Sequence, residues 1–167
     1  DAPERLRILQ ERIIRYSRDV LDYQHFAIFV LDPRTNRLEM VISEGLDPQA
    51  EKAELLASPE GNGISGYVAA TGRSYICPDV RRDERYVRGM GDARSSLTVP
   101  LRLRDRVVGV MNVESDRVGA FTEEDRQFGE IFAHYVAVAL HMLRLLVSER
   151  HTASSQVSGS MMAELAG

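Results

Sequence analysis

Cysteine and lysine are almost absent from this chain of 167 residues. Cys77 is the only cysteine, so no disulfide can form within the chain, and such usage is typical of a reducing compartment. We therefore expect a cytoplasmic location. No apolar run approaches the roughly 20 residues that cross a bilayer. The first residues also lack the basic segment followed by an apolar stretch that is typical of a signal peptide. We therefore expect no contact with a membrane.

Motifs that hold metals or phosphates are missing as well. The four histidines, at positions 25, 134, 141 and 151, are dispersed, and neither His-Glu-x-x-His nor Cys-x-x-Cys occurs. The phosphate-binding pattern Gly-x-x-x-x-Gly-Lys-Ser/Thr is also absent. We expect no metal site, no cofactor and no catalytic residue.

The charge is unevenly distributed along the chain. The net charge of −4 argues against nucleic acid as a partner, because phosphate binding usually needs a basic surface. Between Arg73 and Arg106, however, nine arginines stand against five acidic residues, a balance of +4 that leaves −8 for the remainder. Two interpretations stay open: a loop that attracts an anionic small molecule, since arginine suits carboxylates and phosphates, or a solvated surface.

Hydrophobic spacing predicts helices at both ends of a chain that is otherwise rich in strands. Residues 1–22 are predicted to be an N-terminal helix, with Pro3 in its first turn. Residues 23–150 are predicted to form one domain, and residues 151–167 a linker to a downstream region. Within the domain we expect strands at 25–31, 38–44, 75–77, 95–103 and 107–115, short helices at 49–57 and 64–71, and one helical turn around 84–87.

The last helix, expected from about residue 123 to 150, is apolar on more than one side. Thr122 with Asp125 three residues later predicts its N-cap. One sheet cannot cover so wide an apolar surface, so we expect a homodimer that forms through the terminal helices. The expected seam has spacings of four and three: Phe128, Phe132, Tyr135, Ala139, Met142 and Leu146.

Five blocks of sequence, in order, resemble the GAF domain family. They are GISGYVAATGR (63–73), YICPDV (75–80), SLTVPL (96–101), VGVMNVES (108–115) and FTEED (121–125). Each block alone is unspecific, but their order and spacing are specific, and the resemblance covers residues 25 to about 140.

The resemblance implies an α/β (α+β) fold with a central antiparallel sheet of about five to six strands. The long N- and C-terminal helices would cover one face, and short helices with a ligand-pocket loop the other. It also implies a non-catalytic sensory domain of a signalling protein, such as a sensor histidine kinase. Such a domain binds a small molecule and dimerises to pass a signal to an effector domain.

Candidate ligand contacts come partly from strand periodicity. Even positions of the strand 107–115, among them Val108 and Asn112, share one face, and so do Ser96 and Thr98 of the neighbouring strand. Polar residues in the middle of core strands are costly unless paired. Ser96, Thr98 and Asn112 are therefore candidates to contact a polar ligand, with internal hydrogen bonding or solvent exposure as the alternative.

The other candidates are implied by the resemblance, which places a pocket rim at Glu44, Ile64, Ser65, Tyr86 and Asp92. The long irregular stretch 79–94 is expected to act as a lid over the pocket, since such stretches inside a compact domain are often functional. Four of its arginines would then be within reach of a ligand: Arg81, Arg85, Arg88 and Arg94.

Other functions of the family fit less well. Reduction of free methionine sulfoxide needs a nucleophilic and a resolving thiol, and this chain has Cys77 alone. Cyclic-nucleotide-binding relatives carry Asn-Lys…Phe-x-x-x-Asp-Glu, of which Phe121 and Asp125 match the second half, whereas Asn112 is followed by Val113. Two alternatives stay open: a ligand-free dimerisation scaffold, and an effector-binding domain of a transcription regulator.

Overall fold

The computed structural model describes residues 1–47, 54–87 and 91–143. Its helices are α1 (Ala2–Asp19), α2 (Gly63–Thr71), the short 3-10 helix η2 (Val80–Arg82) and a last helix over residues 123–143. The strands are β1 (His25–Leu31), β2 (Arg37–Glu44), β3 (Leu55–Leu56), β4 (Tyr75–Cys77), β5 (Ser95–Leu103) and β6 (Arg106–Ser115).

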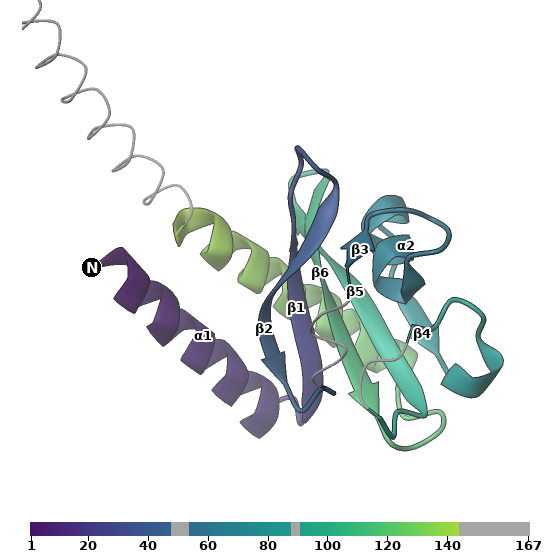
Figure 1. Cartoon of the computed structure of the whole chain (residues 1–167). Helices are drawn as coiled ribbons and strands as arrows, with labels where there is room; N and C mark the ends of the chain where they lie inside the picture. Colours follow the sequence, from purple (N-terminus) through teal and green to yellow (C-terminus); the bar gives the residue numbers. More distant parts are fainter. Residues whose placement is uncertain (48–53, 88–90, 144–167) are drawn as a thin grey trace, which may run out of the picture.

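The six strands form one antiparallel sheet in the order β3-β2-β1-β6-β5-β4. α1 and the last helix lie side by side on one face, and α2 lies on the other (Figure 1). Tyr16 of α1 stacks on Phe132 of the last helix, with ring centroids 5.4 Å apart. The α+β architecture expected from the sequence is confirmed. Among the described residues, no helix combines the length and apolar character that crossing a membrane requires.

Side chains of the central strand β1 alternate between two apolar cores. Phe26 and Ile28 are fully buried on the side of the terminal helices. Ala27 and Phe29 are buried on the side of α2. Because both faces of the sheet are covered, β1 is apolar at nearly every position instead of alternating with polar residues.

Two bulges interrupt this alternation. In β2, Val41 is the extra residue, since Phe29 pairs with Met40 and Ile28 with Ile42. In β6, Val108 is the extra residue between the pairs that Gly109 and Val107 make with β5. Without a bulge, residues two positions apart in a strand lie on the same face of the sheet. When a bulge adds a residue between them, they lie on opposite faces.

The predicted strands and long helices are confirmed, whereas the short helix expected at 49–57 is not found in its described part. Gly72 ends α2 in the left-handed conformation, as its position after Thr71 predicts. Leu55 and Leu56, expected in a helix at 49–57, form the edge strand β3. Around residues 84–87, where one helical turn was expected, a single turn is closed by the hydrogen bond from the Tyr86 N–H to the Asp83 carbonyl (3.3 Å), and the short helix η2 lies a few residues earlier. Residues 49–53, 144–150 and 151–167 lie outside the described residues, so the predicted end of the last helix and the linker do too.

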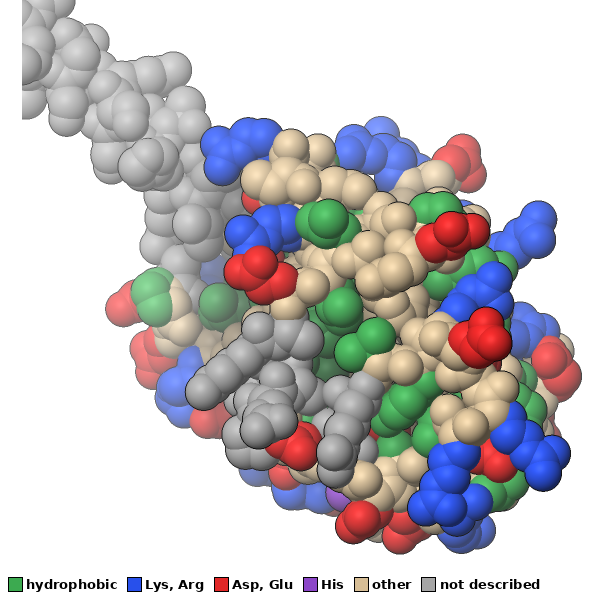
Figure 2. Space-filling model, turned by 45° about the vertical axis from the view of Figure 1, so that its right-hand side comes forward, with side chains coloured by type: hydrophobic (Ala, Val, Ile, Leu, Met, Phe, Trp, Pro, Cys, Tyr) green, Lys and Arg blue, Asp and Glu red, His purple; other side chains and the backbone are tan. Residues whose placement is uncertain are grey.

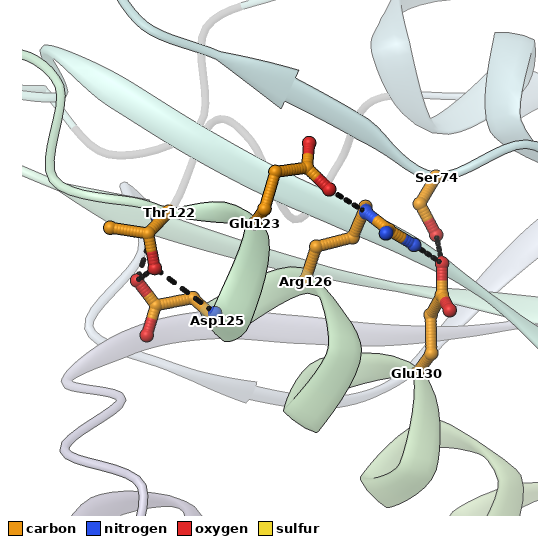
Figure 3. A network of polar contacts seen from close by, with 6 residues as sticks. All are labelled: Ser74, Thr122, Glu123, Asp125, Arg126 and Glu130. Carbon is orange, nitrogen blue, oxygen red and sulfur yellow. Dashed lines mark hydrogen bonds and ion pairs between the residues drawn. The ribbon is translucent and has the colours of Figure 1, made fainter.

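The N-cap predicted for the last helix is confirmed. The Asp125 carboxylate accepts a hydrogen bond from the Thr122 backbone N–H (2.8 Å), and the Thr122 hydroxyl accepts one from the Asp125 backbone N–H (3.2 Å; Figure 3). This reciprocal pair satisfies two backbone donors that a helix start otherwise leaves open.

Two glycines are expected to respond to alanine with opposite signs. A Cβ at Gly109 would overlap the Phe29 carbonyl oxygen, so Gly109→Ala should lower the free energy of unfolding by about 1–3 kcal/mol or more. A Cβ at Gly129 in the last helix would meet Leu97 and Tyr23 at ordinary distances of 3.4 and 3.5 Å. Gly129→Ala should therefore stabilise by up to about 1 kcal/mol through helix propensity. Urea unfolding of both variants measures the difference, and equal effects would contradict the packing described.

Candidate functional site

A small cavity lies between the sheet and α2. Its floor comes from β1, β2, β5 and β6, and its roof from the start of α2 and from residues 86–87. Its volume is about 40 Å³, which suits two or three water molecules. The lining is Ala27, Phe29, Met40, Leu46, Leu55, Gly63, Ile64, Ser65, Tyr86, Val87, Ser96, Asn112 and Glu114.

A chain of hydrogen bonds runs along the floor of the cavity. The Thr98 hydroxyl donates to Asn112 Oδ1 (2.7 Å), and Asn112 Nδ2 donates to Glu114 Oε1 (3.0 Å). From the roof, the Tyr86 hydroxyl donates to Glu114 Oε2 (2.8 Å). Glu114 is only 4% exposed, so each carboxylate oxygen is held by a directed donor, as burial of such a group requires.

Ser96 supplies a further polar group. It pairs directly with Glu114 across β5 and β6 and is 1% exposed. Its Oγ is buried and finds no hydrogen-bond partner of normal geometry among the described residues. A buried hydroxyl that lines a cavity is a position where a water or a ligand gains a hydrogen bond.

The structure brings most of the predicted site residues together. Five of the eight line the cavity: Ile64, Ser65, Tyr86, Ser96 and Asn112. Thr98 is not part of the lining; it pairs with Asn112 across β5 and β6, and its hydroxyl orients the amide of Asn112. Glu44 and Asp92 are not part of the lining, and Asp92 is exposed.

The bulge at Val41 explains the position of Glu44. Met40 precedes the bulge and lines the cavity, whereas Ile42 follows it and packs with the terminal helices. Glu44 shares the face of Ile42, and its carboxylate lies 3.8 Å from the guanidinium of Arg18 in α1. The same reason applies to Val108, which contacts the core beneath the terminal helices and not the cavity face.

The arginines expected near the ligand do not line the cavity. The guanidinium of Arg85 lies over the ring of Tyr67, 4.4 Å from its centroid, and Arg81 is exposed. Arg94 is absent from the lining, and Arg88 lies outside the described residues. The ionisable side chain that the described lining does contain is an acid, Glu114, which does not favour the anionic ligand suggested by local charge.

Part of the irregular stretch 79–94 does cover the cavity. Its two ends are pinned, since the Val80 N–H donates to the Arg94 carbonyl (2.8 Å) and the Arg94 N–H to the Ser115 carbonyl (2.8 Å). Tyr86 and Val87 reach back over the floor between these ends. On this face of the molecule, hydrophobic side chains gather in the middle, and arginines and carboxylates are mixed around them (Figure 2).

Glu114 is the main residue that the sequence-based set missed. The period-two rule places it on the face of Asn112, so the pattern already contained the information. The apolar lining from β1 and β2 was also missed: Ala27, Phe29 and Met40. For these residues the same rule applies, but it has to be combined with the strand order, which the sequence does not state.

The thiol of Cys77 is fully buried on the cavity side of the sheet. Burial, and secondarily the negative charge of Asp83, raise its pKa from 9.0 to about 11. A thiol with such a pKa is a poor nucleophile at neutral pH, because the thiolate is the reactive form. Within the described residues, no group of three His, Cys, Asp or Glu side chains is arranged to hold a metal ion.

Comparison with known families gives one match that spans most of the chain. The model described as GAF domain matches residues 4–141. Among curated proteins, the "Probable 3′,5′-cyclic phosphodiesterase pde-5" of Caenorhabditis elegans is 25% identical over 146 residues, which is 80% of this chain. The match spans only 20% of the length of that relative.

Solved structures share the fold at low identity. The GAF domain of a phosphoenolpyruvate-protein phosphotransferase from Coxiella burnetii superposes with a TM-score of 0.72 at 18% identity, covering 86% of each chain. The type II free methionine-R-sulfoxide reductase of Thermoplasma acidophilum gives 0.70 at 20% identity, covering 86% of this chain and 97% of its own. At such identities the likeness concerns the fold alone.

Alkylation of Cys77 tests the description of the thiol. We expect iodoacetamide at pH 8 to modify the native protein hardly at all and the urea-unfolded protein rapidly, because the native thiol is buried and protonated. Mass spectrometry of the intact protein over time measures both rates. Rapid native alkylation would contradict the burial and the raised pKa.

Proposed function

Because the chain belongs to the GAF domain family, we propose that it is a non-catalytic sensory module that binds a small molecule in the cavity and dimerises through its terminal helices. Relatives of this family occur in signalling proteins, which supports a sensory domain. One observation carries the assignment of the site: the sheet buries Glu114 and Ser96 at a cavity and places the half-buried Asn112 beside them. A purely structural core would gain by replacing them with apolar residues.

The proposed ligand carries N–H donors or a positive charge on a partly apolar body. Both oxygens of Glu114 accept hydrogen bonds, and Ser96 offers a further hydroxyl. Phe29, Met40 and Ile64 supply an apolar wall. A small amine, amidine or heterocyclic base satisfies both parts of this lining, whereas an anion would meet the carboxylate of Glu114.

Binding of a ligand larger than a few atoms requires the roof to move. Sites for small molecules usually have about 300–1,000 Å³, far more than the cavity has in this conformation. Tyr86 is the residue that closes it, through the hydrogen bond to Glu114. A ligand donor that replaces the Tyr86 hydroxyl on Glu114 would release residues 83–87, so we assign this segment as the lid.

The small volume also supports a second candidate, a dimerisation scaffold without ligand. In that case the hydrogen bonds among Thr98, Asn112, Glu114 and Tyr86 are internal only, and the cavity holds water. Catalysis by thiol chemistry is less well supported than either, since Cys77 is buried and has no second cysteine to resolve an intermediate.

The proposed dimer interface is an apolar stripe on the last helix. The opposite side of this helix packs on the sheet through Ala133, Val136, Ala137 and Leu140. The stripe recurs at spacings of three and four and is left exposed: Phe128 (55%), Ile131 (56%), Tyr135 (68%), Val138 (36%) and Met142 (60%). Such a row suits the same row of a second copy related by a twofold axis, as in a coiled coil.

The ligand class can be tested by thermal shift with a panel sorted by charge. We expect amines, amidines and purine bases to raise the melting temperature and carboxylates and phosphates to have no effect. A ligand at 100 times its dissociation constant adds about 2.7 kcal/mol of stability. Glu114→Gln should abolish the shift, and the exposed control Glu60→Gln should keep it. A panel without any effect would favour the scaffold, and a shift that survives Glu114→Gln would exclude this cavity.

The interface can be tested by sedimentation velocity. Tyr135→Glu with Met142→Glu should convert dimers to monomers, because a buried unpaired charge opposes association strongly. Both positions are exposed in the single chain, so its folding should be unaffected, which circular dichroism checks. Arg34→Glu, exposed in the turn between β1 and β2 and with the same change in net charge, is the matched control and should remain dimeric. A wild-type chain that is monomeric at high concentration would refute the interface.

A further inference from the structure

One carboxylate joins the last helix to the connection between α2 and β4. The Ser74 hydroxyl donates to Glu130 Oε1 (2.7 Å), and the Arg126 guanidinium donates to the same oxygen (2.7 Å; Figure 3). Arg126 also donates to Glu123 Oε2 (2.6 Å). The orientation of the Glu130 carboxylate is therefore fixed from its own helix, and Ser74 binds to a prearranged acceptor.

Ser74 is tied to the elements on the cavity side of the sheet. It lies between Gly72, which ends α2, and Tyr75, which begins β4. The Tyr75 hydroxyl donates to Asp83 Oδ2 (2.5 Å). The ring of Tyr75 also contacts the ring of Tyr67 in α2 edge to face, with centroids 5.6 Å apart. A displacement of Asp83 would thus reach Ser74 through one aromatic side chain and one peptide bond.

Asp83 is in turn the anchor of the lid. Its Oδ1 accepts the Arg85 backbone N–H (2.9 Å), and its carbonyl accepts the Tyr86 N–H (3.3 Å). Tyr86 then closes the cavity on Glu114. The contacts from Glu114 through Tyr86, Asp83 and Tyr75 to Ser74 are consecutive, and each is a hydrogen bond or a covalent neighbour.

The last helix makes few directional contacts with the remainder of the described chain. Within the described residues, two side-chain hydrogen bonds connect it to other elements: Ser74 to Glu130, and His134 Nδ1 to the Arg102 carbonyl (3.3 Å). The other contacts are apolar, and apolar packing is not directional. A hydrogen bond, by contrast, loses most of its strength when distance or angle changes. The short bond at Glu130 is therefore the contact best suited to register a movement of β4.

From these contacts we infer that the Ser74–Glu130 hydrogen bond is the junction through which the state of the Tyr86–Glu114 contact reaches the last helix. The inference rests on the proposed function in that it takes residues 83–87 as the lid and the last helix as the output. Glu130 is a positioning residue: it touches no part of the cavity and acts through Ser74. Opening of the lid loosens Asp83 and Tyr75, weakens the bond to Ser74 and releases the helix on the side of Glu130.

Hydrogen exchange measured by mass spectrometry tests the junction without any ligand. Tyr86→Phe keeps the ring and removes the donor to Glu114. We expect peptides from the lid (83–87) and from residues 126–137 of the last helix to exchange about two- to tenfold faster, the effect of losing one net hydrogen bond. In a Ser74→Ala background, adding Tyr86→Phe should still speed exchange in the lid but should no longer change the helix.

A matched control separates this effect from general loosening. Ser58→Ala also removes a serine hydroxyl, one that donates to the Glu60 carbonyl at 3.1 Å, and lies off the path. In that background Tyr86→Phe should affect the helix as it does in the wild type. Two results would overturn the junction alone. In one, Tyr86→Phe speeds hydrogen exchange in the lid but not in the helix; in the other, it speeds exchange in the helix equally with and without the Ser74 hydroxyl. No change in the lid or the helix would overturn both the junction and the proposed lid.

Discussion

Coverage of the sheet on both faces is the constraint on which the other features of this molecule depend. The buried apolar side chains of β1 and β6 each belong to one of two cores, beneath the terminal helices or beneath α2. Because both faces are covered, neither face of these central strands is open to solvent. Register therefore decides the surroundings of each residue, and a single bulge, such as the one at Val41, moves all the following side chains of a strand to the other core.

Polar residues in such a sheet need partners at the positions that register gives them. Thr98, Asn112 and Glu114 meet this need by forming a line of directed hydrogen bonds, which Tyr86 completes from outside the sheet. Apolar residues at these positions would cost less free energy to bury, but they would not distinguish one small molecule from another. The same bonds that satisfy the buried carboxylate also hold the roof shut, so stability of the core and access to the cavity are linked.

The elements packed on the two faces of the sheet are held by different kinds of contact. On the cavity side, α2, β4 and the lid are connected by hydrogen bonds and by contacts between Tyr67, Tyr75 and Arg85. On the helix side, apolar packing dominates, and Glu130 supplies one of the few directed contacts. A layer that is held mainly by apolar contacts can shift without breaking many bonds, which suits a helix that also exposes an apolar stripe.

Much of the fold could be predicted from the sequence because the signals are local. The strands, the left-handed Gly72 after α2 and the Thr122–Asp125 cap each depend on residues a few positions apart. The family resemblance and the face shared by Ser96, Thr98 and Asn112 follow from the same short-range patterns. These features follow directly from the order of residues, since propensity, capping and alternation act over single turns and strands.

Tertiary structure alone decided the features that join distant segments. The bulges took Glu44 and Val108 away from the cavity face, because a bulge is stabilised by the pairing of two strands and has no signal in either. The meeting of Tyr86 with Glu114, 28 residues apart, and that of Ser74 with Glu130, 56 residues apart, depend on where loops end in space. Arg85 follows the same rule: its presence was readable from the sequence, but its direction was set by the ring of Tyr67 in α2.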